Sequence, residues 1–258
     1  MRREVIQGNG LEIALAEWRL GGEGPPLVLL HGITGRALDW DPVVQALGAL
    51  APFSSRVIAL DARGHGYSDW DPDGSYGGDQ HFADVVQVLT RLGIECCLLA
   101  GFSMGGGVAI MTAAANPSLV KRLVVVDSYP GPLMTDGSFS IAQALSSWWK
   151  RFGSTDGIRP DPPLGGFPFD PRIAGAFARD LAAGDPRRLD LWPFWEALEC
   201  STLIIRGELS TVLPADVASM MVARQPLSRL ETLPGVGHGL PFARPRQLAT
   251  ALSEFLGA

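Results

Sequence analysis

The sequence predicts an α/β domain whose mostly parallel sheet is covered by helices on both faces. Short apolar runs such as Leu27–Leu30 alternate with amphipathic stretches such as residues 79–92. This alternation is typical of strands joined by crossover helices. The runs hold few charged residues, as expected for strands buried on both faces. With 258 residues, of which 47% are hydrophobic, the chain can form one large domain, with room for a smaller insertion.

The first half of the chain predicts a hairpin, four further strands and three helices. The hairpin strands, at residues 5–7 and 11–18, alternate around Gly8-Asn9-Gly10, an Asn-Gly turn signal. Asp39 is a candidate cap for the first helix, which we expect to run to about Leu50. In order, the expected elements are strand 27–30, helix 39–50, strand 56–60, helix 79–92, a strand, turn and helix within 94–115, and strand 121–127.

The second half contains a change of pattern. Residues 128–198 hold many prolines, four tryptophans and only short helical pieces. The alternation then resumes with a strand at 202–206, a helix after Pro214, a strand at 229–232 and a last helix at 244–256. We therefore expect a core formed by residues 1–127 and 199–258, with residues 128–198 inserted as a separate helical segment.

The turn within 94–115 carries the pattern Gly-x-Ser-x-Gly, as Gly101-Phe102-Ser103-Met104-Gly105. Between a buried strand and a helix this pattern is typical of a nucleophile elbow, which exposes the serine hydroxyl at the tip of a sharp turn. The two glycines let the strand and the helix approach closely. Two other interpretations are a glycine-rich loop with a solvent-exposed serine and, because residues 96–115 carry no charge, a membrane span. The internal glycines and the rest of the chain favour a buried core element.

A serine hydroxyl is inert at neutral pH unless a base takes its proton. His238 lies in Gly235-Val236-Gly237-His238-Gly239, between the last strand and the last helix. The carboxyl ends of parallel strands meet at one edge of a sheet, so His238 can reach Ser103 there. We expect His31 and His65 to be structural residues that hydrogen-bond the backbone, and His81 to be exposed at a helix start.

Acyl transfer also needs two hydrogen-bond donors for the oxyanion that forms. The Met104 N–H, at the start of the helix, is one candidate. The loop after Leu30 supplies the other, for which we favour the Ile33 N–H. The alternative for His31-Gly32 is a plain turn. In residues 61–69 the polar cluster of Asp61, Arg63, His65 and Asp69 is expected to be structural.

The ordered set of HG at 31–32, DARGHGYSD at 61–69, GFSMGG at 101–106 and GVGHG at 235–239 resembles the α/β-hydrolase family, in its esterase- and lipase-like branch with a cap domain. The resemblance covers nearly the whole chain and is weak within 128–198. It implies an eight-stranded, mostly parallel sheet with a helical cap inserted after the sixth strand. It also implies a Ser–His–acid triad, acyl transfer through a serine ester, and no cofactor.

The sequence departs from that family at the acid. Where the family usually places it, after the strand that follows the cap, this chain has Ser210, or Thr211 with a one-residue shift. Two carboxylates can substitute. Asp127 ends the strand after the elbow helix, where the haloalkane dehalogenases, among other branches of the family, place their acid. Glu208 is nearer the usual loop but directly follows a glycine. We favour Asp127; the alternative is that it only ties down the loop that follows.

The overall charge and the cysteines limit the partners and the compartment. The net charge is −6 with a pI near 5.2, and no cluster of Lys and Arg occurs, so we expect neither nucleic acid nor membrane as a partner. The first ten residues lack the apolar run of a signal peptide. Cys96, Cys97 and Cys200 are interpreted as reduced core residues, so we expect a cytoplasmic protein. No Cys/His spacing predicts a metal site.

The substrate is expected to be a small to medium, largely uncharged ester or lactone. Phe102 and Met104 flank the nucleophile. Trp148, Trp149 and Trp192, in the inserted segment, are candidate substrate-binding residues; for any single one of them, packing of the cap against the core is the favoured alternative. The leading function is a serine hydrolase of carboxylic esters. A lactonase or C–C bond hydrolase with the same triad stays open, as does a ligand-binding relative without catalysis. The oligomeric state is left open.

Overall fold

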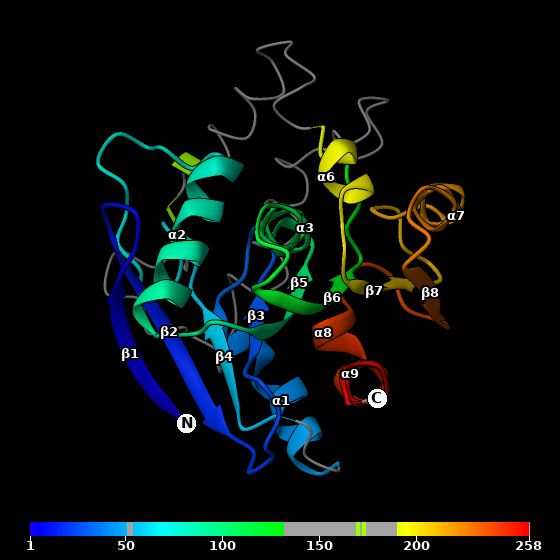
Figure 1. Cartoon of the computed structure of the whole chain (residues 1–258), viewed down its shortest axis with the longest axis horizontal. Helices are drawn as coiled ribbons and strands as arrows, with labels where there is room; N and C mark the ends of the chain where they lie inside the picture. Colours follow the sequence, from blue (N-terminus) through cyan, green and yellow to red (C-terminus); the bar gives the residue numbers. More distant parts are fainter. Residues whose placement is uncertain (51–53, 132–168, 171, 174–189, 258) are drawn as a thin grey trace, which may run out of the picture.

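The computed structural model describes residues 1–50, 54–131, 169–170, 172–173 and 190–257. An eight-stranded sheet runs through the molecule in the order β1-β2-β4-β3-β5-β6-β7-β8, with helices on both faces (Figure 1). The predicted α/β-hydrolase fold is confirmed. The strands are β1 (Arg2–Gln7), β2 (Glu12–Arg19), β3 (Leu27–Leu30), β4 (Arg56–Leu60), β5 (Cys97–Phe102), β6 (Val120–Val126), β7 (Ser201–Gly207) and β8 (Ser228–Leu233). The expected cap at 128–198 lies mostly outside the described residues.

The pairing of the strands brings their carboxyl ends to one edge. β1 and β2 form the predicted hairpin, and β2 pairs antiparallel with β4. All pairs from β4 through β3, β5, β6 and β7 to β8 are parallel. β5 lies between β3 and β6, so loops that follow these strands meet beside the end of β5.

Alternate side chains of the strands enter two apolar cores, one on each face. The helices are α1 (Asp41–Gly48), α2 (Gly78–Arg91), α3 (Met104–Ala115), α6 (Trp192–Glu196), α7 (Ala215–Arg224), α8 (Leu240–Ala243) and α9 (Pro245–Leu256). One core joins Val28 and Leu30 of β3 to side chains of α2, α3, α6 and α7. The other joins Leu27 and Leu29 to α1, α8 and α9. Figure 1 shows these two groups of helices on opposite sides of the sheet.

Several local expectations need correction. The helix expected at 39–50 begins as a 3₁₀ turn, η1 (Ala37–Trp40), and continues as α1 because Pro42 starts a new helix. Asp39 accepts a hydrogen bond from Arg36 N–H at 3.0 Å within that turn, so it does not cap α1. The short helix α8 was not predicted. Cys97 and Cys200 are buried as expected, whereas Cys96 is half-buried just before β5.

Two described parts of the expected insertion pack on the core. Asp170 accepts a 2.5 Å hydrogen bond from the Tyr76 hydroxyl and forms an ion pair with Arg172. In α6, Trp195 is fully buried and its Nε1–H donates to the Met221 carbonyl of α7. These contacts fasten both parts to the helical face that carries α2 and α7.

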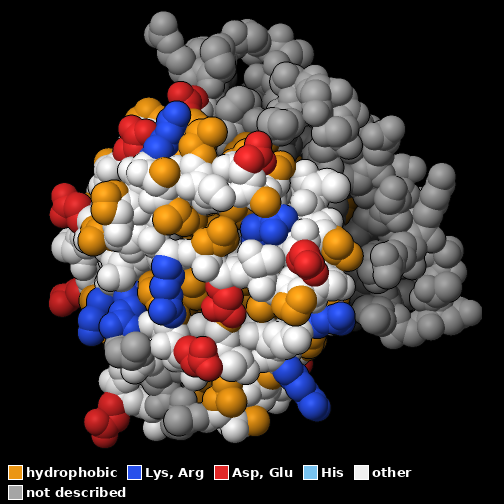
Figure 2. All heavy atoms as spheres, turned by 90° about the vertical axis from the view of Figure 1, so that its right-hand side faces the viewer, with side chains coloured by type: hydrophobic (Ala, Val, Ile, Leu, Met, Phe, Trp, Pro, Cys, Tyr) orange, Lys and Arg blue, Asp and Glu red, His pale blue; other side chains and the backbone are white. Residues whose placement is uncertain are grey.

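β8 is the last strand of the sheet, at the edge opposite to β1. On the face that β8, α7 and α9 present, side chains of both charges lie among scattered apolar ones (Figure 2). Arg229 is exposed on β8 and Glu231 is half-buried, and charges on an edge strand discourage pairing with another sheet. In the part of the chain that the structure describes, no helix combines the length and apolar character that a membrane crossing requires.

Candidate active site

Ser103 lies at the tip of the turn between β5 and α3. Its φ of 53° and ψ of −118° place it in a region that non-glycine residues rarely adopt. The glycines on either side permit this turn, because a Cβ on Gly105 would lie 2.5 Å from the Leu30 carbonyl oxygen and one on Gly101 would overlap the Gly105 carbonyl. The Ser103 side chain is thereby presented at the carboxyl edge of the sheet.

His238 reaches Ser103 from the loop between β8 and α8. Its Nε2 lies 3.0 Å from the Ser103 Oγ. The Phe102 ring packs beside the imidazole, with the ring centres 4.8 Å apart, and Phe102 is itself buried. The buried Phe102 ring therefore restricts the position of the His238 imidazole. With its proton on Nδ1, the neutral imidazole can accept the hydroxyl proton of Ser103 at Nε2.

Asp127 completes the line of contacts. It follows β6, is fully buried, and has a positive φ of 47°. Its Oδ2 lies 2.6 Å from His238 Nδ1, and its Oδ1 accepts the Gly207 N–H at 3.0 Å. The structure thus brings Ser103, His238 and Asp127 together in one chain of hydrogen bonds, from three separate loops.

The alternative acid points elsewhere. Glu208 is exposed, and its Oε2 accepts the Gly235 N–H at 2.8 Å. This contact fixes the loop that leads to His238, whereas the imidazole of His238 is held by Asp127. Of the two carboxylates considered, only Asp127 has a hydrogen bond to the imidazole.

The sequence placed Ser210 at the usual position of the acid but assigned it no role. In the structure its Oγ lies 2.5 Å from Asp127 Oδ2, the oxygen that also contacts His238. No sequence pattern could have predicted this contact, because Asp127 follows a different strand and lies 83 residues away in the chain.

The loop after β3 lies beside Ser103, as the oxyanion prediction requires. A Cβ on Gly32 would come within 3.2 Å of the Ser103 Cβ. No backbone hydrogen bond among the described residues uses the N–H of Ile33 or of Met104. Both donors are therefore free of backbone partners next to Ser103.

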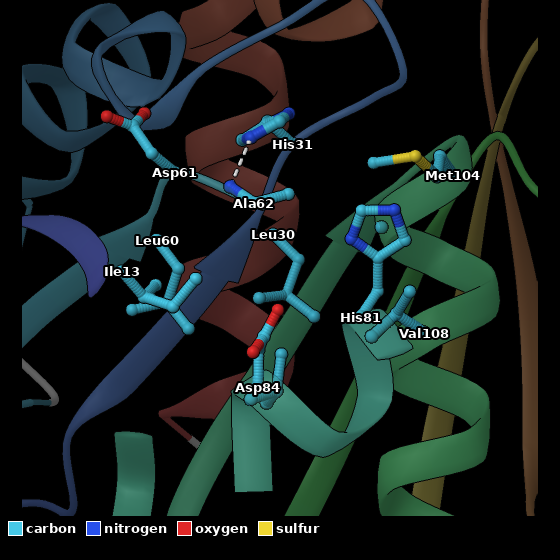
Figure 3. A pocket seen from close by; sticks show the side chains of 12 residues that line it. Ile13, Leu30, His31, Leu60, Asp61, Ala62, His81, Asp84, Met104 and Val108 are labelled. Carbon is cyan, nitrogen blue, oxygen red and sulfur yellow. Dashed lines mark hydrogen bonds between the residues drawn. The ribbon is translucent and has the colours of Figure 1, made fainter. Parts of the chain in front are cut away.

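Two buried histidines hold this loop, as expected. His31 Nε2 accepts the Ala62 N–H at 2.9 Å, while its Nδ1 lies 2.7 Å from the Gly32 carbonyl (Figure 3). His65 Nε2 lies 2.8 Å from the Ile33 carbonyl oxygen. Burial lowers the pKa of both His31 and His65 to about 4, so both rings are neutral at pH 7 and serve as fixed hydrogen-bonding groups.

The expectation that His81 is exposed is wrong. It is 4% exposed, and neither ring nitrogen has a hydrogen-bond partner of normal geometry among the described residues. Burial lowers the pKa of His81 well below its ordinary value; the Tyr76 backbone opposes that shift. Figure 3 shows the ring beside Met104 and Val108. The start of α2 packs against α3, and this packing buries His81.

Two small cavities flank the loop after β3. One, of about 20 Å³, lies behind the elbow and is lined by His31, His81 and Met104 among others. The second is of similar volume and is lined by Trp40, Phe102 and Phe242 among others. Neither includes Ser103 or His238, so neither marks the position of the reacting bond.

The remaining candidate residues differ in where they lie. Trp192 packs under the guanidinium of Arg224, 4.5 Å from the ring centre, and joins the core on the α3 side. This contact favours packing as its role. Trp148 and Trp149 lie outside the described residues. Among the described residues no group of three or more His, Cys, Asp or Glu side chains could hold a metal ion.

Comparison with known proteins bears on the family and the fold of the chain. The model of the alpha/beta hydrolase family matches residues 27–251. The chain is 28% identical to a 3-hydroxybutyrate-oligomer hydrolase of Cupriavidus necator, over 99% of this chain and 97% of that one. It is 28% identical to an esterase of Mycobacterium tuberculosis, over 91% and 84%. The structure of an E-2-(acetamidomethylene)succinate hydrolase matches with a TM-score of 0.78 at 24% identity, covering 100% and 99%; this likeness concerns the fold alone.

Proposed function

This chain belongs to the alpha/beta hydrolase family, and we propose that it is a serine hydrolase that cleaves carboxylic esters through an acyl-enzyme intermediate. One observation carries the proposal. Hydrogen bonds of 3.0 and 2.6 Å join Ser103 to His238 and His238 to Asp127. This is the arrangement that an activated serine nucleophile requires.

In the first half of the proposed reaction, Ser103 Oγ attacks the ester carbonyl carbon while His238 Nε2 takes the hydroxyl proton. Asp127 stabilises the imidazolium and holds the ring in the productive tautomer. The tetrahedral intermediate then collapses, and the alcohol leaves with the proton from Nε2. Water repeats the sequence on the acyl-enzyme, so that the carboxylic acid is released and Ser103 regains its proton.

The N–H groups of Ile33 and Met104 are proposed to bind the oxyanion of both intermediates. Backbone donors fixed beforehand stabilise this charge without reorganisation, and removing one such donor commonly slows turnover by about 10²- to 10³-fold. The His65 contact to the Ile33 carbonyl supports this role, because it fixes the same residue whose N–H would bind the oxyanion.

We propose a small to medium, largely uncharged substrate and a cytoplasmic location. The names of two relatives, an esterase and a 3-hydroxybutyrate-oligomer hydrolase, support an ester over the other bonds that this family cleaves. Phe242, 53% exposed and packed edge-on to Phe102, offers an apolar surface near the nucleophile. The unpaired cysteines fit a reducing compartment.

The test is turnover of p-nitrophenyl esters of increasing acyl chain length, with simple lactones measured in parallel. We expect saturable ester hydrolysis with an optimum at short to medium chains, and its loss in Ser103→Ala. Faster turnover of lactones than of esters would move the assignment to lactonase. Turnover of neither by the folded protein would contradict catalysis and favour a ligand-binding role.

A further inference from the structure

Ser210 is held between the backbone and the carboxylate of Asp127. It is 8% exposed. Its Oγ lies 2.5 Å from Asp127 Oδ2, and the N–H groups of Val212 and Leu213 donate to the same Oγ at 3.1 and 3.3 Å. The hydroxyl thus has two donors on one side and a carboxylate oxygen on the other.

This arrangement fixes the direction of the hydroxyl proton. The two N–H groups occupy the lone pairs of the Ser210 oxygen, which leaves its one proton to be donated. Asp127 Oδ2 is the acceptor within hydrogen-bond distance. A hydroxyl that donates to a carboxylate makes a strong, charge-assisted hydrogen bond.

We propose that Ser210 is a positioning residue of the Ser103–His238–Asp127 group: it orients the Asp127 carboxylate and draws negative charge from the oxygen that holds His238. The inference rests on the proposed hydrolase function. Gly207 N–H fixes Oδ1 and Ser210 fixes Oδ2, so the carboxylate cannot rotate away from the imidazole. Ser210, at the family's usual acid position, therefore acts on His238 indirectly, through Asp127.

The consequence for the proton chemistry has a definite sign. Without the Ser210 hydroxyl, Asp127 Oδ2 carries more of the negative charge and binds the imidazolium of His238 more strongly. Protonated His238 is inactive as a base. The acidic limb of the pH profile of kcat/KM should therefore move to higher pH in Ser210→Ala.

The first experiment compares Ser210→Ala and Ser210→Thr with the exposed control Ser219→Ala. We expect Ser210→Ala to lower kcat by about 10- to 100-fold, the worth of one hydrogen bond to a charged group, with little change in KM and with the shifted limb. Ser210→Thr retains the hydroxyl and should recover most of kcat. A lower melting temperature with unchanged kcat and pH profile would overturn the proposal and leave Ser210 as a residue that only holds the turn to Leu213.

A second measurement separates this proposal from the proposed function. NMR titration of the His238 ring in the wild type and in Ser210→Ala reads the contact without any substrate. A higher midpoint in Ser210→Ala supports the positioning role even in a protein that turns over no ester. Equal midpoints in two folded proteins contradict it, whatever the activity.

The geometry also predicts rescue by an exchanged acid. A carboxylate at position 210 extends one bond beyond the present Oγ, toward the place now held by Asp127 Oδ2, 2.6 Å from His238 Nδ1. In Asp127→Ala/Ser210→Asp that place is vacated, and the new carboxylate can accept the hydrogen bond from His238 Nδ1 there. We expect at least a tenfold recovery of kcat over Asp127→Ala alone. No recovery in a folded double variant would contradict the position of the 210 side chain against the carboxylate that holds His238.

Discussion

The backbone conformation of Asp127 and its side-chain contacts both direct its carboxylate toward His238. Its φ of 47° lies in the left-handed region, which Asp tolerates better than most residues because its short polar side chain can bond locally. In that conformation the carboxylate is fully buried and meets Gly207 N–H, Ser210 and His238. Backbone strain of about 1–3 kcal/mol at such positions persists only when surrounding contacts fix it.

At the residue scale, substituting each candidate acid by its amide should affect kcat very differently. Asp127→Asn should lower kcat by about 10³- to 10⁴-fold, because the amide can donate to His238 Nδ1 and favour the wrong tautomer. Glu208→Gln should keep kcat within about threefold, since its amide oxygen can still accept the Gly235 N–H. Steady-state kinetics on one ester decides, with circular dichroism as the check on folding. A larger loss in Glu208→Gln would reverse the assignment.

The sequence narrowed the acid to two residues and favoured Asp127, because other branches of the family place their acid at this strand end and Glu208 directly follows a glycine. Asp127 and Glu208 both follow strands that end at the same edge of the sheet, and only the contacts across loops distinguish their roles. For His81 the prediction was wrong. Its place at a helix start indicated exposure, yet the first turn of α2 buries the ring against Met104 and Val108 (Figure 3).

At the scale of elements, the strands were the most predictable part. Strands such as Leu27–Leu30 and Leu203–Ile205 within β7 are buried on both faces, so their apolar runs identify them without help from neighbours. The pieces that were missed or shifted, η1 and α8, are single turns of four residues each. Turns this short depend on Pro and on tertiary contacts more than on periodicity.

The nucleophile elbow gives a prediction with a control in the same element. Gly101→Ala should destabilise the protein by several kcal/mol or prevent folding, because the added Cβ meets the rigid backbone of Gly105. Gly107→Ala, in α3, meets only the Leu191 side chain at 3.2 Å and gains up to about 1 kcal/mol of helix propensity. Urea denaturation measures both. Equal effects would contradict the close approach of strand and helix at the elbow.

At the scale of the whole molecule, two apolar cores cover the faces of the sheet, while a buried polar cluster holds the loops at its carboxyl edge. Arg63 is 1% exposed and pairs with Asp84 at 2.6 Å, and Asp61 accepts the backbone N–H groups of Ala37 and Tyr67. The structural role predicted for this cluster agrees with those contacts. His65 belongs to the same cluster and links it to the loop after β3 through the Ile33 carbonyl.

Neutral buried His65 makes stability depend on pH. Its pKa is about 4 in the folded protein against an ordinary 6.5, so between these values the unfolded chain binds more protons. The contribution of His65 is therefore present above pH 6.5 and is lost as the pH falls toward 4, by about 1.4 kcal/mol per pH unit.

We therefore expect the loss of unfolding free energy in His65→Gln to shrink between pH 7 and pH 5, by roughly 1–2 kcal/mol. Buried Thr112 has no titrating group, so Thr112→Val should lose the same amount at both values. Denaturant titrations at the two pH values measure these differences. A pH-independent loss in His65→Gln would mean that the ring is not held neutral.

His238, held by Asp127, is proposed to activate Ser103. The most direct test of this activation is reaction with a fluorophosphonate probe followed by peptide mass spectrometry. We expect one adduct per chain, on Ser103, formed far more slowly in a folded His238→Ala variant. No adduct on Ser103 in the wild type, or an equal rate in His238→Ala, would contradict it.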